Sequence, residues 1–134
     1  MEIGLFTGFI SFFLTATVLV IVFLYLYAIV TPYDDYKLIF EENSLAASLG
    51  FGGAVIGVSI PLYSVLVHSV SYVDFAIWGV IAIVIQLLFA FIVTRVDGKY
   101  SFKAKISNGD VSVGALMAFL SIAIGLLNAG SMSY

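Results

Sequence analysis

The sequence predicts an all-α integral membrane protein with four transmembrane helices, and two patterns support this fold class. The first is a set of four apolar runs of about twenty residues or more, long enough for a helix to cross a hydrocarbon core of roughly 30 Å. These runs lie at residues 3–30, 45–67, 72–94 and 111–130. The second is the placement of the five cationic residues, all of which lie in the two segments 31–43 and 95–110 between apolar runs.

The cationic segments also predict the orientation in the membrane. Lysine and arginine are retained in cytoplasmic loops, so residues 31–43 and 95–110 are expected to face the cytoplasm. The N-terminus, the short turn at residues 67–72 and the C-terminus then lie on the outer side. In a bacterium this means a multi-pass protein of the inner membrane.

The composition agrees with this class and argues against several others. Of the 134 residues, 63% are hydrophobic and 10% are charged, and the mean hydropathy is +1.19. A soluble domain of this size has too much surface for its volume to bury that much apolar material. We therefore expect a single membrane domain over residues 1–134. The net charge of −3 and the lack of an extended basic patch argue against a nucleic-acid partner.

The chain also reads as two copies of one unit, with repeat 1 at about residues 1–68 and repeat 2 at about 69–134. Residues 39–43 align with residues 106–110, and in both an apolar residue is followed four positions later by Asn43 or Asp110. Asn and Asp are good N-cap residues, so each is expected to begin the next membrane helix. Each unit crosses the membrane twice, which predicts two parallel two-helix repeats.

Both cytoplasmic linkers mix charged and bulky apolar residues. Pro32 is expected to end the first helix. Either linker could lie in the headgroup region as a short interfacial element, or could be a plain connector whose tyrosines join the interfacial aromatic belt. The residues proposed to contact a partner protein or anionic lipid are Tyr33, Asp34, Asp35, Tyr36, Lys99, Lys103 and Lys105.

Small residues form a stripe on the second and fourth predicted helices. Such stripes let helix backbones approach closely, so we expect these two helices to pack together, with the bulkier first and third outside. The alternative is that one stripe forms a subunit interface. The predicted packing residues are Gly50, Gly53, Gly57, Gly114, Ala118 and Gly125. Pro61 should free the carbonyl group of Gly57 and introduce a kink or flexible point.

A set of five polar residues lies in or beside the second, third and fourth predicted membrane helices, and it allows two interpretations. His68 and Asp74 could meet across a short turn as a pH-sensing or ion-attracting pair, with further amides lining a path. The structural alternative is that Ser71 and Asp74 form a capping box and that the amides bond helices together, which is the commoner role. The set comprises His68, Ser69, Asp74, Gln86 and Asn128.

The residues needed for catalysis or for metal and cofactor binding are not found in a recognisable pattern. The chain has no cysteine and one histidine, so a metal site is not expected. There is no glycine-rich nucleotide loop and no nucleophile beside a base. We expect no catalytic residue, no cofactor and no enzymatic activity.

These segments together resemble the YjfL-like family, bacterial inner-membrane proteins with a domain of unknown function. The matching stretches are residues 31–35 (TPYDD), residues 43–62, His68-Ser69, Asp74, Trp78-Gly79, Gln86 and residues 125–129 (GLLNA). Asp35 and Glu42 stand where the family pattern usually has Glu and Gly. The resemblance implies four spans built from a duplicated two-span unit. It also implies an accessory role beside envelope-stress proteins, including peripheral membrane-binding partners.

Three functional hypotheses follow. The first is a non-enzymatic inner-membrane protein that forms homo-oligomers and docks a peripheral membrane protein through its cytoplasmic linkers. The second is a small oligomeric channel with a polar path near Gln86, His68, Asp74 and Asn128. The third, a membrane enzyme, depends on His68 and Asp74 as the only acid–base cluster.

Overall fold

The computed structural model describes residues 2–132, which form helices and connecting loops without a β-strand in that range. The helices are α1 (Glu2–Val30), α2 (Asp35–Phe40), α3 (Leu45–His68), α4 (Tyr72–Thr94), α5 (Phe102–Ser107) and α6 (Val111–Ser131), with a 3-10 turn, η1, at Gly98–Tyr100. Four of them, α1, α3, α4 and α6, are long and apolar enough to cross a membrane. The predicted all-α class and the four apolar helices are confirmed.

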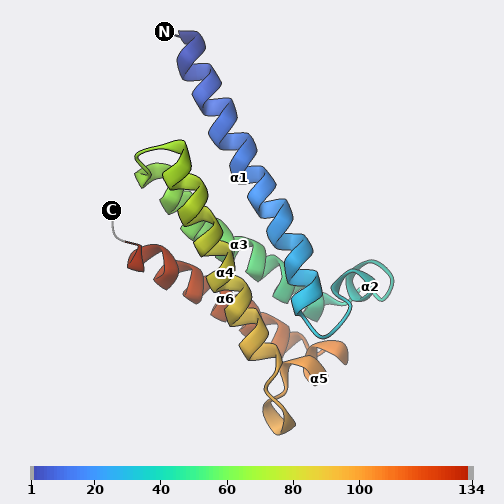
Figure 1. Ribbon diagram of the computed structural model, residues 1–134. Coiled ribbons are helices and arrows are strands. Elements are labelled where there is room, and N and C mark those ends of the chain that lie inside the picture. Colours follow the sequence, from blue (N-terminus) through green and yellow to red (C-terminus); the bar gives the residue numbers. More distant parts are fainter. Residues whose placement is uncertain (1, 133–134) are drawn as a thin grey trace.

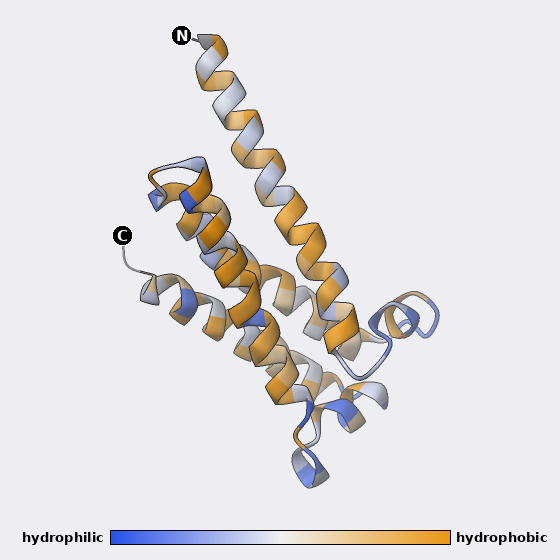
Figure 2. Ribbon diagram, viewed as in Figure 1, coloured by the Kyte–Doolittle hydropathy of each residue, from blue (hydrophilic) through white to orange (hydrophobic). Residues whose placement is uncertain are grey.

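The long helices leave both chain ends on one side and the linkers on the other. Figure 1 shows the N-terminus of α1, the turn between α3 and α4 and the end of α6 toward one end, and α2, η1 and α5 at the opposite end. Hydrophilic residues gather at the α2 and α5 end, whereas the long helices are mostly hydrophobic (Figure 2). The duplication into two repeats and the sidedness of the termini stay predictions.

Helices α3 and α6 form the most extensive contact, and small residues make it close. A Cβ atom added at Gly53 would lie 2.2 Å from the Cα atom of Ala118, and one added at Gly114 would lie 2.3 Å from the carbonyl oxygen of Ala46. Both distances are far below van der Waals contact. The two stripes of small residues therefore pack against each other within one chain. Gly50 is less tightly enclosed, with Met117 Cγ 3.5 Å from the added Cβ.

Pro61 lies inside α3 without ending the helix. Because proline has no backbone N–H, the carbonyl group of Gly57, four residues earlier, lacks its helical donor. That carbonyl oxygen faces α6, where a Cβ added at Gly125 would lie 2.1 Å from it. Gly125 thus provides the space that the freed carbonyl group of Gly57 occupies.

The start of α3 corrects one prediction. Its N-cap is Ser44, whose hydroxyl oxygen accepts from the Ala47 N–H at 3.1 Å, and not Asn43. Asn43 instead adopts a left-handed conformation with φ of 52°, which asparagine tolerates better than most residues. In the second linker Gly109 has φ of 82° and Asp110 is the N-cap of α6, as predicted. In conformation, Asn43 therefore corresponds to Gly109, and Ser44 corresponds to Asp110. The predicted alignment of Asn43 with Asp110 is shifted by one residue.

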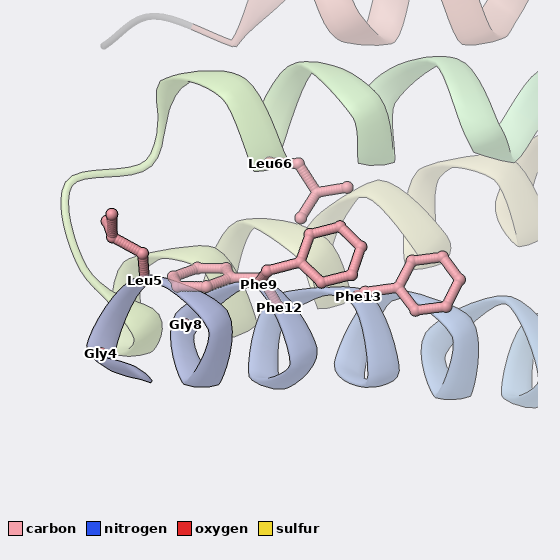
Figure 3. A pocket seen from close by; sticks show the side chains of 7 residues that line it. All are labelled: Gly4, Leu5, Gly8, Phe9, Phe12, Phe13 and Leu66. Carbon is pink, nitrogen blue, oxygen red and sulfur yellow. The ribbon is translucent and has the colours of Figure 1, made fainter. Parts of the chain in front are cut away.

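Helix α1 is the least enclosed of the long helices. In an apolar stretch of 18 residues, only 6% of α1 is buried, against 50% of the corresponding stretch of α3. Its N-terminal half borders an open apolar groove of about 390 Å³ that Leu66 of α3 closes on the other side (Figure 3). The side chains that line it are all apolar, as expected of a surface at membrane depth that lipid tails can cover.

Candidate functional site

The polar residues at the turn between α3 and α4 mainly organise the start of α4. The Ser71 hydroxyl oxygen accepts from the Asp74 N–H at 3.1 Å, and Asp74 Oδ2 accepts from the Val70 N–H at 3.1 Å. A carboxylate in the first turn also interacts favourably with the helix dipole. His68 is exposed, and its Nδ1 lies 2.9 Å from the carbonyl oxygen of Ser64. Ser69 is the C-cap of α3. This geometry supports the capping role of Asp74.

Gln86 and Asn128 meet in the interior, away from that turn. Their side chains are 3% and 6% exposed. Asn128 Nδ2 donates to Gln86 Oε1 at 3.4 Å and to the Ala82 carbonyl oxygen at 3.3 Å, and Gln86 Nε2 donates to the Ser121 carbonyl oxygen at 3.4 Å. A Cβ added at Gly57 would lie 3.0 Å from Gln86 Nε2, so α3 closes the third side. The two amides thus bond α4 to α6 in a packed three-helix junction.

The second linker presents a basic surface, which we define as Lys99, Lys103 and Lys105. All three side chains are exposed. Lys99 Nζ lies 5.6 Å from the ring centroid of Tyr100, which is itself 72% exposed. Beside them is a cavity of about 100 Å³ whose lining combines Lys99 and Lys105 of this surface with apolar residues. Its lining residues are Lys99, Tyr100, Ser101, Phe102, Lys105, Val113 and Leu116. Positive charge and apolar contact therefore lie side by side where α6 begins.

The first linker departs from the predicted surface. Asp34 and Tyr36 are exposed, but Asp35 is 1% and Tyr33 9% exposed, so these two cannot contribute to a docking surface. The reason is local. Asp34 takes the N-cap position of α2, with Oδ1 accepting from the Lys37 N–H at 3.1 Å. Asp35 is thereby turned back toward the end of α1.

Asp35 is held there by Thr31, the residue that follows α1. The Thr31 hydroxyl group donates to Asp35 Oδ2, whereas Asp35 Oδ1 is buried without a hydrogen-bond partner among the described residues. Burial raises the pKa of the Asp35 carboxyl from 3.8 to about 7; the Thr31 hydrogen bond opposes this rise and the charge of Asp34 adds to it. Burial also raises the pKa of the Tyr33 phenol above its ordinary value, and the charge of Asp35 raises it further.

Arg95 makes contacts between helices that the sequence analysis did not predict. Its Nη2 donates to the carbonyl oxygen of Val30 at 3.0 Å and its Nη1 to the Thr94 hydroxyl oxygen at 3.2 Å. Its guanidinium carbon lies 4.5 Å from the centroid of the Phe91 ring. A cation at a helix C-terminus satisfies a free carbonyl group and the helix dipole. Arg95 therefore joins the ends of α1 and α4 at the linker side.

Comparison with known proteins gives a consistent family match. The family described as Domain of Unknown Function (DUF350) matches residues 1–132. The chain is 37% identical over 127 residues to the UPF0719 inner membrane protein YjfL of Escherichia coli (strain K12), covering 95% of this chain and 94% of that protein. It is 23% identical over 126 residues to the UPF0719 transmembrane protein YshE of Bacillus subtilis (strain 168), covering 91% and 90%. No solved structure matches. The chain belongs to the DUF350 family.

Proposed function

We propose that this protein is a non-enzymatic inner-membrane protein whose linker end docks a peripheral membrane protein at the cytoplasmic face. Its relatives are named inner membrane and transmembrane proteins, and four of its helices are long and apolar enough to span a membrane. The observation that carries the proposal is the basic surface, which is exposed at the same end as α2. Asp34 and Tyr36 are the exposed part of the first linker there.

The chemistry of the basic surface favours an acidic partner that itself lies on the membrane. Lysines near the cytoplasmic leaflet attract anionic lipids by about 1 kcal/mol each, and the same charges attract acidic side chains. Tyr100 and the apolar wall of the adjoining cavity, which includes Val113 and Leu116, would accept an apolar side chain or an acyl chain beside the charge. The partner in this proposal is an envelope-stress protein that binds membranes peripherally.

The test is co-purification of membrane-associated proteins with the detergent-extracted chain. Replacing Lys99, Lys103 and Lys105 together by glutamate should remove the partner, because the surface charge changes sign. The matched control replaces the same three residues by arginine, which keeps the charge and should keep the partner. Equal recovery with the glutamate variant would remove the proposal.

Self-association is part of the proposal and rests on a different helix. The stripes of α3 and α6 face each other within one chain, so they are not available for a second copy. On α1, Gly4 and Gly8 have GxxxG spacing, and an added Cβ at either meets nothing within 4 Å. Gly8→Leu should weaken the oligomer in chemical crosslinking, whereas Gly52→Leu, also in open space on α3, should not. An unchanged oligomer in Gly8→Leu would exclude this face.

A channel has less support than docking. Gln86 and Asn128 bond to each other inside one chain, and Asp74 is engaged in starting α4. A conducting path would therefore have to lie between chains. Ion flux through reconstituted oligomers would favour the channel, and a folded oligomer without flux would count against it.

A further inference from the structure

A cluster of buried polar side chains lies where α1 ends and α2 begins. We call it the buried carboxyl cluster and define it as Tyr27, Thr31, Tyr33 and Asp35. The exposed fractions are 1% for Asp35 and Tyr27, 5% for Thr31 and 9% for Tyr33. A carboxyl group this deeply enclosed outside the hydrophobic spans is unusual, since Asp is almost never fully buried unless it is paired.

The hydrogen bonds of the cluster fit a neutral carboxyl group better than an ionised one. An ionised carboxylate accepts at about four lone-pair sites and a protonated carboxyl group gains an O–H donor. Within residues 2–132, the side-chain donor bonded to Asp35 is Thr31, at Oδ2. Among the described residues, Asp35 Oδ1 remains buried without a hydrogen-bond partner. A buried carboxyl oxygen without a donor favours the neutral, protonated form of the group over the carboxylate.

The charges around the cluster do not supply a counter-ion to Asp35. Arg95 is committed to the carbonyl oxygen of Val30 and the Thr94 hydroxyl group. Helix α3 contributes the ring of Phe51, 5.6 Å from the Tyr27 ring, and carries no charged residue at this end. The charged side chains at this end of α1, α2 and α4 are all exposed: Asp34, Lys37, Glu41, Glu42 and Arg95. A buried carboxylate without a partner cation is strongly disfavoured and takes up a proton instead.

We propose that the buried carboxyl cluster is a proton-binding site that fixes α2 against the end of α1. With α2 packed, Asp35 holds one proton. When α2 moves away and water enters, the O–H bond of the carboxyl group breaks and the proton passes to bulk water. The site is independent of the docking proposal. The position of α2 would nevertheless also set where the exposed side chains of Tyr36 and Asp34 lie, because Tyr36 is in α2 and Asp34 is its N-cap.

The direction of the effect follows from linkage. Packing raises the affinity of Asp35 for its proton, so the packed position of α2 is favoured at low pH. It is lost as the pH rises toward and through about 7, the value to which burial raises the pKa of Asp35. The site would thus respond to pH changes in the neutral range.

The test uses the full chain in nanodiscs and the infrared band of a protonated carboxyl group. The wild-type protein should lose one such band with a midpoint near pH 7. Asp35→Asn should lack the band, and Asp34→Asn should keep it, because asparagine also caps a helix and Asp34 is exposed. Titration of every carboxyl group in the ordinary acidic range, or a band that survives in Asp35→Asn, would overturn the proposal.

Two further measurements keep the proposal testable if Asp35→Asn fails to fold. Thr31→Val removes the hydrogen bond that lowers the pKa of Asp35, so the midpoint should move upward. The chain has no cysteine, so Phe40→Cys gives a single site for a spin label. The label should become more mobile across the same midpoint, since Phe40 ends α2 and is 77% exposed. Unchanged mobility, or a midpoint that falls as sodium concentration rises, would contradict proton control of α2.

Discussion

At the scale of single residues, two adjacent aspartates have opposite surroundings. Asp34 is exposed and caps α2, whereas Asp35 is buried against Thr31. The sequence shows two acidic residues after Pro32 and cannot show which one turns inward, because that depends on the end of α1 packing beside α2. A signal was nevertheless present. Thr31 and Asp35 are four residues apart across a proline turn, which is compatible with a hydrogen bond between their side chains.

The raised pKa of Asp35 predicts a pH-dependent stability. The folded value of about 7 lies above the unfolded value of 3.8, so this group stabilises the folded state fully below pH 3.8, and the contribution is lost as the pH rises through about 7. The melting temperature of the wild type should therefore fall over that window. In Asp35→Asn this part of the pH dependence should be absent. A wild-type melting temperature that rises over the window would contradict the burial of a protonated Asp35.

At the scale of elements, the contact between α3 and α6 follows from small residues that the sequence makes visible. The spacing of Gly53 and Gly57 indicates a close helix approach, and the structure places Ala118 and Gly125 opposite them. The register of the contact was not predictable, since a stripe of small residues fits several partners. What distinguishes the observed partner is Pro61, because the carbonyl group that it frees needs the space at Gly125.

A pair of neighbouring glycines on α3 tests this contact. Gly53→Ala should destabilise the protein by about 1–3 kcal/mol, because the new Cβ would lie 2.2 Å from the backbone of Ala118 and the helices must separate. Gly52→Ala should be neutral or slightly stabilising, since nothing lies within 4 Å of its Cβ and alanine favours a helix. Unfolding in detergent measures both. Equal stability of the two variants would mean that α3 and α6 are not packed this closely.

At the scale of the whole molecule, hydropathy and charge were sufficient to predict the four long helices and the position of both linkers at one end of the molecule. The exceptions depend on contacts between distant segments. Arg95 bonds the carbonyl oxygen of Val30, 65 positions away in the chain, and no local pattern indicates such a pair. Tyr33 was expected at the surface, but it is 9% exposed beside α2, which packs against α3. The start of α3 differs by one residue because the first linker needs a left-handed residue at Asn43.

The predicted orientation can be measured directly because the chain has no cysteine. Val70 is 90% exposed in the turn between α3 and α4, and Lys103 is exposed on α5. A membrane-impermeant thiol reagent added to intact cells should label Val70→Cys and should not label Lys103→Cys until the membrane is opened. The reverse labelling would place the basic surface outside the cell and remove cytoplasmic docking.

The most direct test of the account compares the linker end with the interior of the helix bundle in one co-purification experiment. The charge-reversed variant of Lys99, Lys103 and Lys105 should lose the bound peripheral protein while remaining folded. Gln86→Leu should cost about 1–2 kcal/mol of stability, because Gln86 makes two hydrogen bonds between α4 and α6, and should retain that protein. Loss of the partner in Gln86→Leu together with full retention in the charge-reversed variant would contradict the account and place the function in the spans.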